Sequence, residues 1–279
     1  MRVPTPVDDQ CLHRIAFGDR PGEPVPPARP GDTPYSRWLR AVALGAQGWY
    51  ASARVVLDSV LVSVPSHHPV HALALATRAS LLRQLGDHAA AAPLDGRAFV
   101  AVSSTPRGPV DRAARCDALT GLAADALGCG RLELADRLLA RTQAELTVDL
   151  GPRDGLARAR IRLHWVRAEV ALARGQFGSA AEDAATALGA AREFGSVRHV
   201  AKSRLLAAAA LTGTSHAAAA SAGEEVLELC DEHHLMPLAW AAAMLVAGVS
   251  SDTARAARAE RMRRDYERVL ARRGGRFRR

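Results

Sequence analysis

Apolar residues recur every three or four positions from Pro34 to nearly the end of the chain, with polar and charged residues between them. This spacing is the period of an amphipathic helix. The apolar residues are mainly alanine, leucine and valine, and aromatic residues make up only 4% of the chain, which favours closely packed helices over sheets. We therefore predict an all-α protein.

Residues 1–33 have a different character. They hold seven of the fifteen prolines and show no sustained period. Such a composition is typical of a flexible or polyproline-like segment. We expect no core to form there. A proline-rich strand could also lie in a groove of its own chain at small entropic cost.

A glycine-centred pattern interrupts the helical period five times. In the stretch LGAQGWYASA (residues 44–53), Gly48 is followed by an aromatic residue two places on and by an alanine five places on. A further alanine, Ala41, stands seven places before this glycine. Glycine can end a helix in the left-handed conformation at little cost. The larger residue would start the next helix, and the small residues would lie where the two helix axes come closest. The five units are Ala41, Gly48, Tyr50 and Ala53; Ala79, Gly86, His88 and Ala91; Ala123, Gly130, Leu132 and Ala135; Ala168, Gly175, Phe177 and Ala180; and Leu206, Gly213, Ser215 and Ala218.

This pattern resembles the tetratricopeptide repeat (TPR), which joins a small residue in one helix, a glycine-x-aromatic turn and an alanine in the next helix. Pro65 stands seventeen residues after Gly48, where that family often places a helix-ending proline. Successive glycines are 38, 44, 45 and 38 residues apart, longer than the usual period of about 34. In spacing alone, these stretched units resemble the repeats in helical sensor regions of bacterial transcription regulators. The resemblance covers about residues 34–234. It implies a right-handed superhelical solenoid of about five TPR-like helix-turn-helix hairpins, followed by C-terminal capping helices.

Two further helices are expected after the repeats. Residues 236–249 form an apolar stretch, and residues 252–273 predict a last helix with Asp252 or Thr253 as N-cap and Gly274 as its stop. A polar outer face on this helix is typical of a terminal cap. Its narrow apolar stripe is Ala259, Met262, Tyr266 and Val269. We divide the chain into a flexible segment (1–33), a TPR-like helical repeat domain (34–249) and an Arg-rich capping helix with a tail (250–279).

The positive charge is concentrated at the C-terminus. The chain carries a net charge of +8, and residues 252–279 contain eleven arginines against four acidic residues, which leaves the rest of the chain nearly neutral. Lys202 is the only lysine. This arginine bias indicates a GC-rich, for example actinobacterial, genome.

The sequence favours a cytoplasmic protein without chemistry of its own. The four cysteines are scattered, the N-terminus lacks a signal-peptide pattern, and the longest apolar run, residues 240–249, is far too short to cross a bilayer. We find no nucleophile elbow, phosphate loop or zinc-protease motif, so we expect no enzyme and no cofactor. Incomplete clusters at His67, His68 and His71 and at Cys230, His233 and His234 lack a full ligand set, and we expect no metal site.

The resemblance implies a concave groove lined by the first helix of each unit, where a protein or peptide would bind. Trp38 and Trp165 would be its anchors, because desolvated aromatic side chains contribute most to binding; alternatively, both are packed between neighbouring helices. A receptor for chaperone tails is disfavoured, since the chain has no asparagine and one lysine. The inward positions of the family correspond here to Trp38, Ser80, Arg83, Asp117, Thr120, Arg162, Trp165 and Glu169.

The Arg-rich tail supports the alternative function, a regulatory module that acts near the transcription machinery or nucleic acid. Positive charge suffices for phosphate contacts without sequence reading. No recognition motif accompanies the tail, and we expect it to be disordered. Its candidate contact residues for an acidic partner are Arg272, Arg273, Arg276, Arg278 and Arg279.

Overall fold

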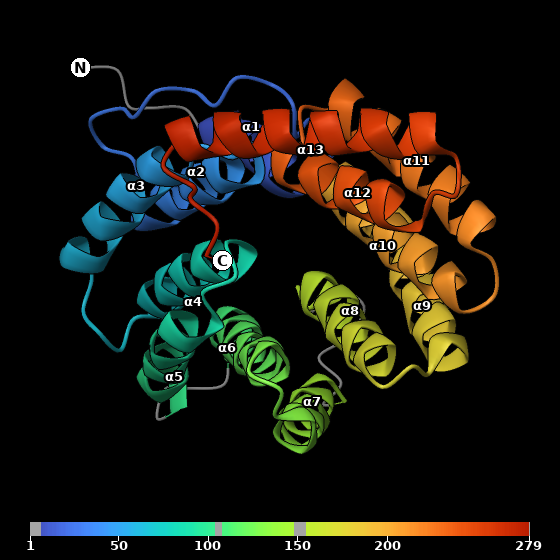
Figure 1. Ribbon diagram of the computed structural model, residues 1–279. Helices are drawn as coiled ribbons and strands as arrows, with labels where there is room; N and C mark the ends of the chain where they lie inside the picture. Colours follow the sequence, from blue (N-terminus) through green and yellow to red (C-terminus); the bar gives the residue numbers. More distant parts are fainter. Residues whose placement is uncertain (1–6, 104–107, 148–154, 279) are drawn as a thin grey trace.

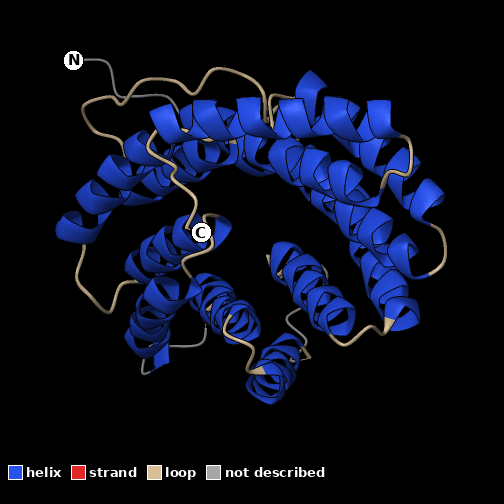
Figure 2. Cartoon of the chain, in the orientation of Figure 1, coloured by secondary structure: helices blue, strands red, loops and turns tan. Residues whose placement is uncertain are grey.

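The computed structural model describes residues 7–103, 108–147 and 155–278, and within these ranges the chain is all-α, without strands (Figures 1 and 2). None of the described helices is long and apolar enough to span a membrane. The helices are α1 (Val7–Phe17), α2 (Pro34–Ala46), α3 (Tyr50–Ser63), α4 (Pro69–Gln84), α5 (His88–Ser103), α6 (Pro109–Gly128), α7 (Leu132–Leu146), α8 (Ala157–Ala173), α9 (Phe177–Phe194), α10 (Val197–Ala210), α11 (His216–Glu232), α12 (Met236–Val249) and α13 (Thr253–Arg272), with a short 3₁₀ turn, η1 (Leu211–Gly213), after α10.

Helices pack in the order of the sequence. From α2 onward each even-numbered helix pairs with the helix that follows it, and the first helices of successive pairs also contact one another, from α2 through α4, α6, α8 and α10 to α12. In Figure 1, α4, α6 and α8 lie around the middle of the molecule, with α5, α7 and α9 on the outside. The first helices of the pairs are therefore placed to line a common interior.

The glycine turns are confirmed in the first four units. Gly48, Gly86, Gly130 and Gly175 all have positive φ angles, from 70° to 83°. Each stands two residues before the next helix, which begins at the larger residue of the pattern. The eight alanines predicted to flank these four turns are fully buried. Small side chains at these positions allow the two helices of a pair to approach closely.

The fifth unit departs from the pattern. Gly213 lies in η1 without a positive φ angle, and α11 begins one residue later than the pattern predicts. As a result Ala218 is exposed and Ala219 is buried in its place. The prediction for Ala218 is wrong, because the 3₁₀ turn adds one residue to the connection.

The expectation that residues 1–33 form no core is wrong. Leu12 and Ile15 on α1 are each only 1% exposed, and α1 packs against α2. The backbone N–H of Val197 on α10 donates to the carbonyl oxygen of Gly18 at 3.2 Å. The proline-rich stretch after α1 follows α2, where the Arg40 side chain donates to the carbonyl oxygens of Pro26 and Pro27. The N-terminal segment therefore connects the beginning of the helix array to α10.

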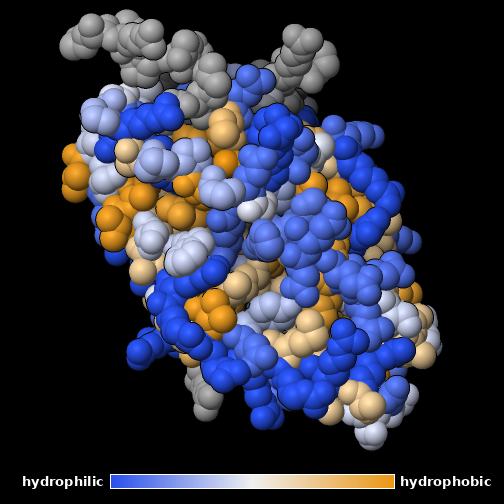
Figure 3. All heavy atoms as spheres, turned by 90° about the horizontal axis from the view of Figure 1, so that it is seen from above, coloured by the Kyte–Doolittle hydropathy of each residue, from blue (hydrophilic) through white to orange (hydrophobic). Residues whose placement is uncertain are grey.

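The C-terminal helix has the predicted bounds. Asp252 caps α13 by accepting hydrogen bonds from two backbone N–H groups, and Gly274 follows the helix with a φ of 87°. Ala259 is buried as expected, but the fully buried residue near the end is Leu270 rather than Val269, and it belongs to the hydrophobic cluster of α2 and α3. The face that carries α13 is mainly hydrophilic, with smaller apolar areas between the polar side chains (Figure 3). Contrary to the expectation for a terminal cap, α13 packs along α12 and also contacts the first hairpin at its C-terminal end.

The expectation of a disordered tail is also wrong for residues 273–278, which we call the C-terminal segment. The carbonyl oxygen of Arg273 accepts a hydrogen bond from the Ala51 N–H at 2.9 Å, and the Arg278 N–H donates to the carbonyl oxygen of Leu85 at 2.8 Å. Between them, the Phe277 ring stacks on Trp240 with a centroid distance of 4.1 Å. The segment thus runs from α13 across α3 to the turn between α4 and α5.

Candidate functional site

A cavity of about 520 Å³ lies between the first helices of the pairs, and all eight predicted groove residues line it. They come from α2, α4, α6 and α8. The structure adds contributions from elsewhere, among them Phe17 from α1, residues of α10 that include Arg198 and Lys202, and the stacked pair Trp240 and Phe277. Phe17 is the only described residue of the N-terminal segment in the lining. Pairs of helices and both ends of the chain therefore enclose one space.

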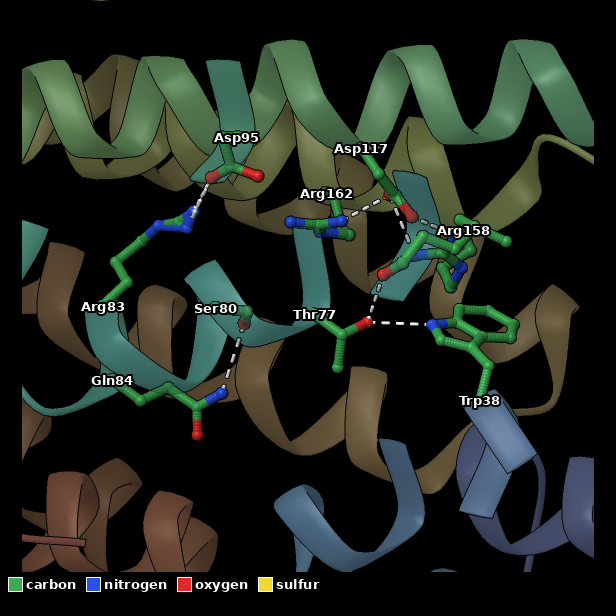
Figure 4. A network of polar contacts seen from close by, with 10 residues as sticks. Trp38, Thr77, Ser80, Arg83, Gln84, Asp95, Asp117, Arg158 and Arg162 are labelled. Atoms are coloured by element: carbon green, nitrogen blue, oxygen red, sulfur yellow. Dashed lines mark hydrogen bonds and ion pairs between the residues drawn. The ribbon is translucent and has the colours of Figure 1, made fainter. Parts of the chain in front are cut away.

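The two predicted anchors are packed between helices and also border the cavity. Trp38 is 3% exposed, and its indole Nε1 donates to Thr77 Oγ1 on α4 at 2.9 Å (Figure 4). Trp165 is half-buried, its Nε1 donates to Ser203 Oγ at 2.8 Å, and its ring stacks on His199. Satisfied indole N–H groups fix the orientation of both rings. Each tryptophan thus presents a rigid apolar wall.

Arg83 is committed to carboxylates behind the cavity wall. Its guanidinium donates to Asp95, which is fully buried (Figure 4). Its Nε lies 3.2 Å from an Asp125 oxygen. Burial and the neighbouring Asp125 raise the pKa of Asp95 to about 7, although Arg83 opposes this shift. Burial likewise raises the pKa of Asp125. The charge of Arg83 is therefore already compensated within the protein.

A second network joins α6 to α8. Asp117 accepts hydrogen bonds from both Arg158 and Arg162, with 2.9 Å between Arg158 Nη1 and Asp117 Oδ1 (Figure 4). Burial alone would raise the pKa of Asp117, but the two guanidinium groups outweigh it and hold this pKa below its usual value. Asp117 is consequently an anion that positions two cations at the cavity wall.

A third guanidinium, Arg198 on α10, borders the same part of the cavity. Its Cζ lies 5.6 Å from the centroid of the Phe17 ring, and that of Arg158 lies 5.1 Å from the same centroid. Burial first, and then Arg158 and Arg162, lower the pKa of Arg198 to about 10. The adjacent His199 is buried, and burial and the same arginines keep its pKa well below 6.5, so it is neutral. Arg198 has no acidic partner among the described residues.

The remaining predicted groove residues, Ser80, Thr120 and Glu169, are polar and line the cavity. Glu169 pairs with Lys202 on α10 at 2.7 Å, and half-buried Ser80 lies one turn from Gln84 on α4. Thr120 is 1% exposed, and its hydroxyl has no hydrogen-bond partner among the described residues.

Sequence reasoning missed Arg158 and the residues of α10. Arg158 precedes Arg162 by one helical turn, so the spacing i, i+4 was a signal that both side chains share a face. For α10 no such signal existed, because the fifth repeat was out of register. Phe17, Trp240 and Phe277 belong to the chain ends, which the repeat pattern does not cover.

Two of the five predicted tail residues, Arg273 and Arg278, are engaged within the chain. The guanidinium of Arg273 lies 3.8 Å above the Trp49 ring and donates to the carbonyl oxygen of Gln47, and Arg278 pairs with Asp87 at 3.1 Å. Arg272 and Arg276 are exposed, and Arg279 lies outside the described residues. Part of the positive charge of the tail is therefore already paired or stacked within the chain.

The histidine and cysteine clusters have local structural roles. The His68 ring accepts a hydrogen bond from the Val70 N–H at the start of α4, and Cys230 is buried near the end of α11. Across the described ranges, no three histidine, cysteine or acidic side chains gather as metal ligands would.

Comparison with known proteins adds no assignment to this geometry. No protein-family model and no curated protein matches the chain. The function must therefore be inferred from the cavity and its lining.

Proposed function

We propose that the chain is a non-enzymatic, TPR-like binding protein of the cytoplasm that takes a short peptide segment of a protein partner into its central cavity. The observation that carries this proposal is the convergence of eight residues, chosen by their inward positions in the repeat, on one cavity. Inward positions in a repeat array form an extended concave surface. The repeated pairs would then constitute a right-handed superhelix of about five hairpins.

The composition of the cavity suits recognition of a peptide. Its apolar walls are aromatic rings held in fixed orientations by hydrogen bonds or stacking, as for Trp38, Trp165 and Trp240. Pre-oriented aromatic side chains lose little conformational entropy on binding and dominate the energy of interfaces. A volume of about 520 Å³ accommodates a few side chains rather than a folded domain.

The C-terminal tail is the weaker candidate for the binding element. Arg273 and Arg278 already contact the chain's own Trp49 and Asp87. A role near nucleic acid that used these two arginines would compete with these contacts. Binding of a peptide in the cavity does not involve these contacts.

Filling the cavity tests the proposal. Ser80 is half-buried and lines the cavity, so Ser80→Tyr should obstruct it, whereas Ser179→Tyr adds the same side chain at an exposed position of α9. Peptides would be selected against the wild-type protein from a random displayed library, and their affinities measured by titration. We expect at least about a tenfold loss for Ser80→Tyr, a cost of about 1.4 kcal/mol, and no change for Ser179→Tyr.

Two results would contradict the proposal. Selected peptides that bind both variants as tightly as the wild type would lie outside the cavity. A library that yields no binding peptide would exclude a peptide ligand.

A further inference from the structure

The cluster of Arg158, Arg162 and Arg198 is the least balanced group of charges in the cavity lining. Arg158 and Arg162 share the single carboxylate of Asp117, and Arg198 shares the Phe17 ring with Arg158. Three cations and one anion leave an excess of two positive charges. Elsewhere in the lining, Lys202 is matched by Glu169, and Arg83 by the carboxylates behind it.

Unused hydrogen-bond donors border the same cavity. Arg198 Nε and Trp240 Nε1 are buried nitrogen atoms without a partner among the described residues, and both can only donate. The hydroxyl of Thr120, also buried and unpartnered, can donate as well. A buried donor without an acceptor costs free energy, so these three groups together favour a ligand rich in acceptor oxygens.

We propose that the arginine cluster, defined by Arg158, Arg162 and Arg198, binds a phosphate monoester. The excess positive charge of the cluster favours a phosphate monoester over a single carboxylate. A phosphate monoester carries a charge of about −1.5 to −2 near neutral pH and matches the excess of two, whereas a single carboxylate leaves one positive charge uncompensated. Guanidinium groups bind phosphate oxygens through paired N–H donors. The rings of Phe17 and Trp38 beside Arg158 would contact the group that carries the phosphate.

This inference rests on the proposed function for the source of the ester, a phosphorylated side chain of the bound peptide. The cavity chemistry is the same for a small phosphorylated metabolite. The two sources are distinguished by which ligand binds more tightly, a phosphopeptide or a simple ester.

The probe is phenyl phosphate, titrated into the full-length protein by calorimetry in a buffer free of phosphate. Phenylacetate provides the singly charged control, and phenylsuccinate a doubly charged dicarboxylate. We expect phenyl phosphate to bind at least tenfold more tightly than either. Arg198→Gln should weaken its binding at least tenfold, Arg198→Lys less, and Arg137→Gln, at an exposed arginine of α7, not at all.

A second arm uses peptide mixtures centred on phosphoserine, phosphothreonine or phosphotyrosine, with their unphosphorylated counterparts. Tighter binding of the phosphorylated mixture identifies a peptide source; binding of phenyl phosphate alone identifies a small ester. Equal affinity for phenyl phosphate and phenylacetate would overturn the inference, as would unchanged binding to Arg198→Gln. The proposed function would survive either failure if selected peptides still respond to Ser80→Tyr, so the two ideas fail separately.

Discussion

Arg198 is expected to destabilise the folded protein, and its replacement by glutamine should raise stability. The guanidinium is half-buried, lines the cavity and has two cationic neighbours, Arg158 and Arg162, that share the one acidic group within the cluster, Asp117. A residue retained at a cost to stability is typical of a binding site. The cost can be calculated from the pKa of the group.

Burial and the two neighbouring arginines lower the pKa of Arg198 from its usual value to about 10. At about 1.4 kcal/mol for each pKa unit, this shift corresponds to an upper bound of about 3 kcal/mol. The Arg198 side chain is only half-buried, so solvent screens part of this penalty, and the glutamine amide must also be buried; we therefore expect a net gain of about 1–2 kcal/mol. Because the pKa of the folded state is the lower one, the penalty is fully present below pH 10 and declines as the pH rises through 10 towards the higher pKa of the unfolded chain.

The assay is thermal and chemical unfolding of the wild type, Arg198→Gln and Arg198→Lys at pH 7 in low salt without phosphate. A gain of 1–2 kcal/mol should raise the Tm by about 2–6 °C in a chain of this size. The difference in Tm between Arg198→Gln and the wild type should decrease in high salt, which screens the repulsion between Arg198 and its two neighbouring arginines. Arg198→Lys keeps the charge and should show little gain. A lower Tm for Arg198→Gln in low salt would refute the reasoning, because it would mean that Arg198 makes favourable contacts that outweigh its burial.

Two further predictions concern the repeat turns. Ala135→Leu should lower the free energy of unfolding by about 1–3 kcal/mol, because Ala135 is fully buried, whereas Ala218→Leu at the exposed position of the fifth unit should change it little; equal effects in denaturant titrations would contradict the register described here. Gly48→Ala and Gly130→Ala both place a side chain at positive φ, but only at Gly48 would the new Cβ collide with Leu270. Gly48→Ala should therefore have the lower Tm of the two variants by several degrees. A smaller loss of Tm for Gly48→Ala than for Gly130→Ala would count against the packing of Leu270 on the first hairpin.

The parts of the fold that were predictable from the sequence are those with local causes. A glycine two residues before an aromatic or large residue determines where one helix ends and the next begins, since the left-handed cap is a property of a few neighbouring residues. Because those turns fix the register of each hairpin, the inward positions of the resembled family could be carried onto the first four units. Residues as far apart as Trp38 and Trp165 were thereby assigned to one surface, and both line the cavity.

The parts that were missed depend on distant contacts. Phe277 has no local feature that predicts its stacking on Trp240, and α1 is an eleven-residue helix beside a proline-rich stretch, stabilised by burial of Leu12 and Ile15. Arg198 was missed for another reason. No inward position was assigned in the fifth unit, where the glycine pattern is weakest and Gly213 lies in a 3₁₀ turn.

The contact between the two ends of the helix array has a consequence for folding. In an open array of repeats each unit is stabilised only by its neighbours, so folding can begin anywhere and proceed in steps. Here Leu270 completes the core of α2 and α3, and Arg54 donates to the Gly274 carbonyl oxygen 220 residues later. Closing a loop of that length costs about 5 kcal/mol of chain entropy. The first hairpin therefore reaches its full stability only after the ribosome has released the last helix, and the chain should unfold as one cooperative unit rather than repeat by repeat.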